Sequence, residues 1–268
     1  MRILSLCLDR TLATPNTVGA LRQVEYYRGH QADVLILEVG APAQLTIEEV
    51  HTQVLGGAHK VVVLARVLRQ ILRSSHSYDL VIAQDVLFIG LLGWIAALRH
   101  GAPLVTQVHG DYLDNPKWLH ERMGNRVRNA IGKFILKRSS GVRCVSGKIV
   151  RDLHERLGVP TDRLLSAPIG TDLSMFTPEG PCADVGGPFV LFVGRLLPEK
   201  SPFLFCDVMI PLMRTNTTLH AVFAGDGPLR EALKERFTIA ALGDRVHFLG
   251  HVGGADLAQY YRSARVML

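Results

Sequence analysis

Short, almost uninterrupted apolar runs recur along this 268-residue chain, and stretches with helical spacing separate them. Strands with one wet face alternate apolar and polar residues, whereas continuous apolar strands are buried on both faces and are typical of parallel sheets. The pattern therefore predicts a doubly wound α/β fold, in which helices cover both faces of each sheet. In the first part of the chain the runs are RILSLCL, DVLILEV, DLVIA, PLVTQV and GVRCV.

Turn-forming residues divide these runs into two groups. The segment TPEGPCADVGGP, residues 177–188, is rich in Pro, Gly and Asp and is typical of a linker. We therefore expect an N-terminal Rossmann-like domain over residues 1–176 and a C-terminal one over residues 189–268. A doubly wound domain needs about 100 to 150 residues. The second is shorter, and we expect it to be incomplete, stopping within a strand that opens with RVML.

Composition predicts a folded, soluble chain. Hydrophobic residues make up 48% and charged residues 20% of the sequence, which excludes a disordered protein. The longest uncharged apolar run, Val86–Leu98, is shorter than the ~20 residues that span a bilayer, so a buried helix is expected there. The opening apolar stretch is too short for a signal peptide. We expect a cytoplasmic protein whose cysteines are reduced core residues, namely Cys7, Cys144, Cys182 and Cys206.

Positive charge is concentrated in one segment. Residues 117–156 contain 11 Lys and Arg against 3 Asp and Glu, while the whole chain has a net charge of +6. A solvated helical face accounts for this segment as well as an anionic lipid surface does, and both interpretations stay open. Nucleic acid is the weaker alternative and is not expected as a partner, because no nucleic-acid-binding signature is present. The segment is thus a candidate contact with the inner membrane face, where the protein would be peripheral.

Two cations stand where a predicted strand meets the helix that follows it. Arg195 ends the run FVLFVGR, and Lys200 precedes Ser201 and Pro202, which are typical N-cap and first helical residues. Loops at the carboxyl ends of parallel strands form the ligand site of such sheets, and helix N-termini attract anions. An arginine fork and a lysine suit a diphosphate, although two ordinary surface cations would have the same spacing. Pro211 is expected to kink or shorten this helix.

Two further loops carry candidate ligand contacts. Gly225, Asp226 and Gly227 follow the next predicted strand, and glycine lets the main chain approach a ligand closely. The pattern is not a dinucleotide fingerprint, because GxGxxG would require glycine at Arg230. In the first domain, His109 follows the run PLVTQV and is expected at the crevice between the domains. A histidine at this place could contact a ligand, but it could equally cap a helix or donate a hydrogen bond to a main-chain carbonyl group.

Longer motifs frame these residues, namely FVGRLLPEK, AGDGPLREALKE, FLGHVGGADLAQYYRSARVML, APIGTDLSMFTP and VRCVSGKIVRDL. With them, nearly the whole chain resembles the family 4 glycosyltransferases, which are retaining enzymes of the GT-B fold with two Rossmann-like domains. The resemblance implies a UDP- or GDP-linked sugar as donor and a glycan or lipid-linked acceptor, in bacterial surface polysaccharide or glycolipid synthesis. It implies neither a bound metal nor another cofactor.

The resemblance also implies a role for each candidate residue. Arg195 and Lys200 neutralise the diphosphate and stabilise the departing nucleotide, where negative charge grows as the glycosidic bond breaks. His109 contacts the transferred sugar, and no general base is nominated. The other donor contacts are Gly19 close to phosphate and acceptor, Gly194 beside Arg195, Gly225, Asp226 and Gly227 near the ribose or base, and His251 and Val252 at the base.

Two departures from the family pattern are visible. Val18 and Gly19 stand where a glycine pair is usual, and the family's acidic motif of paired glutamates is absent, because the sequence stops before its position. We therefore expect a chain truncated within the C-terminal domain. Three hypotheses follow: a nucleotide-sugar glycosyltransferase, a catalytically incomplete fragment or non-catalytic binding protein, and a GT-B nucleotide-sugar epimerase.

Overall fold

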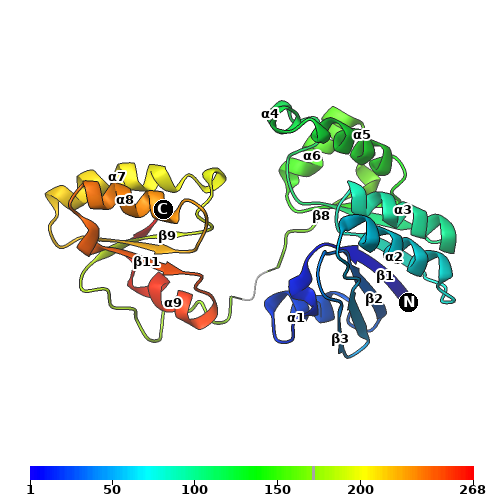
Figure 1. Ribbon diagram of the computed structural model, residues 1–268, viewed down its shortest axis with the longest axis horizontal. Helices are drawn as coiled ribbons and strands as arrows, with labels where there is room; N and C mark the ends of the chain where they lie inside the picture. The colour runs from blue at the N-terminus through cyan, green and yellow to red at the C-terminus, as the bar shows by residue number, and fades with distance from the viewer. Residues whose placement is uncertain (171–172) are drawn as a thin grey trace. The chain divides into compact units, whose positions relative to one another are not determined.

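The computed structural model describes residues 1–170 and 173–268, and the chain forms two compact units, Met1–Ile169 and Gly170–Leu268 (Figure 1). Residues 171 and 172, which belong to the motif APIGTDLSMFTP, lie outside the description. Each unit is a largely parallel sheet with helices on both faces, as the continuous apolar runs predict. The predicted doubly wound α/β class is confirmed.

Unit 1 has the strand order β3-β4-β2-β1-β5-β6-β7-β8. Its elements, in chain order, are β1 (Arg2–Cys7), the 3-10 helix η1 (Arg10–Ala13), α1 (Val18–Tyr26), β2 (Gln31–Ile36), β3 (Ala43–Ile47), β4 (Val50–Val54), α2 (Lys60–Arg73), β5 (Leu80–Ala83), α3 (Phe88–His100), β6 (Leu104–Val108), α4 (Pro116–Glu121), α5 (Gly124–Leu136), β7 (Gly141–Cys144), α6 (Gly147–Leu157), η2 (Thr161–Arg163) and β8 (Leu164–Ser166).

Alternate residues of the unit 1 strands enter two apolar layers. Leu4 of β1 packs with Ile71 of α2 and with α3 on one face of the sheet. Ile3 packs on the other face, with Val34 of β2 and Tyr27 at the end of α1. Burial of both faces is what makes these strands apolar without interruption.

The antiparallel hairpin of β3 and β4 departs from the purely parallel sheet that the sequence predicts. Its register runs from Ala43 opposite Val54 to Ile47 opposite Val50. The turn contains Glu48 with φ of 52°, a left-handed conformation that glycine or asparagine usually supplies. This unusual turn residue is why no hairpin was predicted here.

Unit 2 has the strand order β11-β10-β9-β12, and its paired strands are parallel. Figure 1 shows α7 and α8 on one face of this sheet and α9 on the other. The elements are β9 (Phe189–Val193), η3 (Pro198–Lys200), α7 (Pro202–Thr215), β10 (His220–Ala224), α8 (Arg230–Ile239), η4 (Gly243–Arg245), β11 (Val246–Gly250), α9 (Gly254–Ser263) and β12 (Val266–Met267).

Details of unit 2 refine the sequence predictions. Helix α7 begins at Pro202 as predicted and continues through Pro211 to Thr215, so this proline does not shorten it. Residues 177–188 lie along α9: Arg262 donates hydrogen bonds to the carbonyl oxygens of Thr177 at 3.1 Å and Pro181 at 2.8 Å. The segment is therefore tied to unit 2.

The cysteines and the helices test two expectations from the sequence. Cys7, Cys144 and Cys206 are buried and free, as expected, whereas Cys182 is free but exposed, so its interpretation as a core residue is wrong. Across residues 1–170 and 173–268, no helix has the length and apolar character needed to cross a bilayer.

Candidate functional site

The loops that follow β9 and β10 lie side by side at the carboxyl ends of their strands. The Gly194 amide donates a hydrogen bond to the Ala224 carbonyl at 3.0 Å, and the Leu196 amide donates to the Asp226 carbonyl at 2.9 Å. These main-chain bonds join two segments that are distant in sequence into one surface. We call residues 194–200 together with residues 225–227 the β9–β10 edge.

Glycine is required where the two loops touch. Gly225 has φ of 151°, and a Cβ atom on it would lie 1.9 Å from the Gly194 carbonyl oxygen. A Cβ on Gly227 would lie 2.5 Å from the Leu196 carbonyl oxygen. The sequence predicts that these glycines admit a ligand, but in the structure they admit the main chain of the neighbouring loop. They build the edge on which a ligand would lie.

Asp226 and Arg230 brace this surface. One Asp226 carboxylate oxygen accepts from the Gly227 amide at 2.8 Å, and the other lies 3.3 Å from the Arg230 guanidinium. Arg230 also donates to the Phe248 carbonyl of β11 at 3.1 Å. The Asp226 carboxylate is thus already engaged within its own loop. Sequence reasoning missed the role of Arg230, although its four-residue spacing from Asp226 was a signal.

Arg195 and Lys200 lie on the same edge. The Arg195 side chain is 72% exposed. Within residues 1–170 and 173–268, its one ion-pair partner is Glu199 at 3.6 Å, which is also exposed. The Lys200 Cγ lies 3.9 Å from the position of a Cβ on Gly194, so its stem passes over the β9 loop. Lys200 ends η3, directly before α7. Both charges are therefore available to a ligand beside Gly194.

The start of α7 differs from the sequence prediction in one respect. Ser201 occupies the N-cap position, but it has φ of 52°, and its hydroxyl makes no capping hydrogen bond to the helix. The amides of a first helical turn have no partner within the helix. Pro202 has no N–H, and the Leu204 amide donates to the Ser201 carbonyl oxygen at 3.0 Å. The start of α7 therefore offers an anion next to Lys200 the positive end of the helix dipole and the Phe203 amide, which Ser201 does not cap.

His251 and Val252 follow β11 in the same unit. His251 is exposed, while Val252 is half-buried and packs with Leu249 and Leu257 in the α9-side apolar layer. The structure thus leaves the His251 ring free for contact, and it gives the Val252 side chain a packing role. Only the Val252 main chain is left for the base contact that the resemblance implies.

Gly19 and His109 belong to unit 1. Gly19 lies in the first turn of α1, not in a loop, and a Cβ on it would approach Leu12 of η1 to 3.0 Å. His109 follows β6 and is reached by solvent, yet neighbouring atoms remove part of its hydration. This desolvation, with the charge of Arg143, lowers the pKa of His109, and a hydrogen bond to the Gln84 main chain opposes the shift. Its imidazole is therefore neutral at pH 7.

The structure brings part of the predicted site together. The β9–β10 edge unites Gly194, Arg195, Lys200, Gly225 and Gly227, whereas Gly19 and His109 follow strands of unit 1. Among the residues the structure describes, no group of three or more His, Cys, Asp and Glu side chains is placed to hold a metal ion.

The architecture of two doubly wound units defines the class of the protein. The solved structure of Anabaena HepE in complex with UDP-glucose matches with a TM-score of 0.68 at 20% identity, over 100% of this chain and 73% of that one. An identity this low shows the fold alone, and the fold is of the GT-B type.

The particular family follows from the sequence. A family model described as Glycosyltransferase Family 4 matches residues 17–175, and one described as Glycosyl transferases group 1 matches residues 187–268. The first match covers more than half of the chain, which therefore belongs to Glycosyltransferase Family 4.

Two curated relatives indicate the chemistry found among similar proteins. D-inositol 3-phosphate glycosyltransferase of Nocardia farcinica is 28% identical over 216 residues, which are 75% of this chain and 48% of that protein. The GDP-mannose-dependent alpha-(1-6)-phosphatidylinositol dimannoside mannosyltransferase of Mycobacterium tuberculosis is 25% identical over 247 residues, 86% of this chain and 62% of that protein. The chain spans about half the length of the first curated relatives it matches.

Proposed function

We propose that this chain forms part of a retaining glycosyltransferase that moves a sugar from a UDP- or GDP-linked donor to a glycan or lipid-linked acceptor. The observation that carries the proposal is the pairing of Arg195 and Lys200 with the uncapped start of α7, on one edge of unit 2. The names of the relatives, a glycosyltransferase and a GDP-mannose-dependent mannosyltransferase, support the same reaction class.

The β9–β10 edge would act on the leaving group. As the bond between sugar and diphosphate breaks, negative charge grows on the phosphate oxygens, and fixed cations stabilise it. The Arg195–Glu199 pair is exposed, so it contributes little and exchanges readily for a phosphate oxygen. The guanidinium then offers a fork of N–H donors, Lys200 offers a point charge, and α7 offers the positive end of its dipole.

His109 is proposed as the contact for the transferred sugar, with Gly19 near phosphate and acceptor. Because its lowered pKa keeps the imidazole neutral, one ring nitrogen donates a hydrogen bond and the other accepts one. That suits a sugar hydroxyl better than a phosphate. We assign the protein no general base and no metal.

We also propose that the protein attaches peripherally to an anionic membrane surface, through one part of residues 117–156. Several cations of that segment are neutralised: Lys133 pairs with Asp114 at 2.7 Å, and Lys148 pairs with Asp111 at 2.7 Å. The start of α5 is different. Met123 is 94% exposed beside Arg122 and Arg126, neither of which forms an ion pair within the described part of the chain. An apolar tip among free cations is typical of an interfacial contact.

The transfer proposal is tested with the natural full-length protein and a panel of UDP- and GDP-sugars, with and without glycan and lipid-linked acceptors. We expect a product that retains the anomeric configuration of the donor. Inversion of that configuration would contradict retention. Conversion of free donor without an acceptor would support the epimerase alternative, and donor binding without any reaction would support the non-catalytic one.

The membrane proposal is tested by co-sedimentation with phosphatidylglycerol vesicles. Arg126→Glu should weaken binding at least roughly fivefold, because each basic residue near an anionic surface contributes about 1 kcal/mol. Arg163→Glu is the matched control, since Arg163 is exposed elsewhere on unit 1. Equal loss in both variants would show a general charge effect, and no vesicle binding at low salt would end the proposal.

A further inference from the structure

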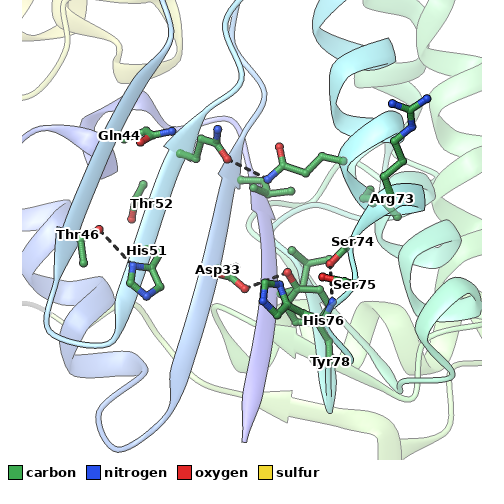
Figure 2. A pocket seen from close by; sticks show the side chains of 15 residues that line it. Asp33, Gln44, Thr46, His51, Thr52, Arg73, Ser74, Ser75, His76 and Tyr78 are labelled. Atoms are coloured by element: carbon green, nitrogen blue, oxygen red, sulfur yellow. Dashed lines mark hydrogen bonds between the residues drawn. The ribbon is translucent and has the colours of Figure 1, made fainter.

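A polar cavity of about 460 Å³ opens on the α2 side of the unit 1 sheet (Figure 2). Its strand residues include Asp33 near the start of β2 and His51 near the start of β4, and α2 ends beside it at Arg73. Gly19 and His109 follow the carboxyl ends of their strands, so they lie toward the opposite edge of the sheet. We call this space the hairpin cavity, and it is separate from the residues proposed for sugar transfer.

The hairpin of β3 and β4 supplies one wall. Gln44 pairs with Gln53 and Thr46 pairs with His51 in the register, so all four side chains share one face. The Thr46 hydroxyl lies 3.2 Å from the His51 Nδ1 atom. On the opposite face of β4, Val50 and Val54 are buried in the α1-side core. The hairpin therefore turns its apolar side to the core and a row of amide, hydroxyl and imidazole groups to the cavity.

Helix α2 and the segment after it form the opposite wall. The Gln70 amide nitrogen donates to the Gln53 side-chain oxygen at 2.9 Å, which holds both amides in place before any ligand arrives. This bond leaves the Gln53 NH₂ group and the Gln70 oxygen with capacity for further partners. Ser75 is exposed on the rim, and the buried Leu35 and Ile71 line the base. Figure 2 shows Gln44 and the residues after α2 facing each other across this space.

The charges around the cavity do not favour an anion. The Asp33 carboxylate accepts from the Arg2 guanidinium at 3.0 Å and from the Tyr78 hydroxyl at 2.9 Å, so its charge is compensated. The carboxyl end of α2, with the negative end of its dipole, lies at the rim and offsets the cation of Arg73. A phosphate or nucleotide would find neither a free helix N-terminus nor a cluster of cations here.

What the cavity does offer is neutral hydrogen bonding over an apolar base. Side-chain amides both donate and accept, and neighbouring hydroxyl groups of a sugar ring do the same. Leu35 and Ile71 are almost fully covered and form a closed floor, so the polar side chains of the walls carry the recognition. The volume falls in the range of about 300 to 1,000 Å³ that is usual for small-molecule sites.

We propose that the hairpin cavity is a carbohydrate-binding site that holds a neutral sugar unit of a glycan, apart from the transfer site. Gln53 and Gln70 provide fixed hydrogen bonds, and Gln44 and Ser75 contact the ligand from the two walls. Binding here needs no nucleotide sugar. If the protein transfers sugar, the site anchors a glycan acceptor or product; that role, unlike the binding, rests on the proposed function.

The test is ligand-observed NMR with the full chain and three neutral probes, maltotriose, cellotriose and mannotriose, without nucleotide. A solvent-open polar site gains little net free energy per hydrogen bond, so we expect a dissociation constant on the order of 1–10 mM for at least one probe. Gln44 is exposed, so Gln44→Trp should place its ring in the cavity without disturbing the core and should abolish the NMR binding signal. Gln53→Leu should weaken binding at least tenfold. Glu49→Ala, in the exposed hairpin turn outside the cavity, is the control and should bind as the wild type does.

Each outcome decides the proposal. Binding that Gln44→Trp removes and Glu49→Ala preserves supports it. Absence of binding for all three probes overturns it, and so does binding that survives Gln44→Trp and Gln53→Leu. Addition of UDP or GDP separates this inference from the transfer proposal: neither nucleotide should displace the trisaccharide, whereas failure of nucleotides to bind would count against the β9–β10 edge alone.

Discussion

The β9–β10 edge of unit 2 and the hairpin cavity of unit 1 are built from different parts of the chain. At the edge, main-chain hydrogen bonds join two loops, and glycines such as Gly225 are needed because no side chain fits. In the cavity, side chains such as Gln44 and Gln53 form the walls, and an ordinary hairpin carries them. Substitution of a glycine at the edge should therefore act through the fold, whereas substitution in the cavity should act on binding.

The largest effect is expected for Gly225→Val. A Cβ atom would lie 1.9 Å from the Gly194 carbonyl oxygen, and φ of 151° is strained for any residue but glycine. We expect unit 2 to lose about 3 kcal/mol or more of unfolding free energy. Hydrogen exchange of peptides from β9 and β10 measures this loss of unfolding free energy. Gly243→Ala, where the nearest atom is 3.9 Å away, is the control, and equal protection in both variants would contradict the account.

Next in size is the loss of a cation from the edge. Arg195→Ala or Lys200→Ala should reduce the turnover of the natural full-length protein about 100-fold, as loss of a preorganised charge contact does. Folding should be unaffected, because both side chains are exposed. Arg214→Ala removes an exposed cation of α7 far along the helix from its start and should stay within a factor of about two. Similar turnover in all three variants would remove the pair from the mechanism.

A smaller change is expected at the cavity. Gln53→Leu removes the hydrogen bond with Gln70, whose net value is about 1 kcal/mol, so unit 1 should remain folded with a slightly lower unfolding free energy. Urea unfolding followed by the fluorescence of Trp94 and Trp118, both in unit 1, measures this change. If Gln53→Leu lowered the unfolding free energy as much as Gly225→Val does, the cavity would depend on the fold as strongly as the edge, and the contrast between the two sites would be wrong.

The smallest effect concerns pH. The His220 Nδ1 and His247 Nε2 atoms lie 3.0 Å apart. Burial is the main cause that lowers the pKa of His247, and the charge of a protonated His220 lowers it further. A histidine with a lowered folded pKa binds fewer protons in the native state than when unfolded. Unit 2 should therefore lose stability as pH falls below the usual histidine range near 6.5, and it should be insensitive above it. His247→Gln should make the stability of unit 2, measured by hydrogen exchange, less dependent on pH. If the pH dependence of stability is unchanged in this variant, other groups cause it.

The same contrast explains what the sequence could predict. Runs such as FVLFVG are buried on both faces, so their strands were predicted to within three residues at each end, and the glycines and cations after them marked the edge. The reason for Gly225 was not predictable, because its neighbour Gly194 comes from a loop 31 positions away in the sequence.

The hairpin cavity could not be predicted in the same way. Its turn places Glu48 where glycine or asparagine is the usual signal, so β3 and β4 were not predicted. The contact between Gln53 and Gln70 depends on how α2 packs against β4, which sequence periodicity does not specify. A site made of side chains from several elements leaves little trace in any one stretch of sequence.

The central claim is that the β9–β10 edge binds the diphosphate of a nucleotide. The most direct test is to titrate UDP and GDP into isotope-labelled protein and to follow the main-chain amide signals. The account predicts that Gly194, Arg195 and Gly225 shift together with the first turn of α7, and that the shifts disappear in the Arg195→Ala, Lys200→Ala double variant. Shifts confined to other regions, or none with either nucleotide, would contradict it.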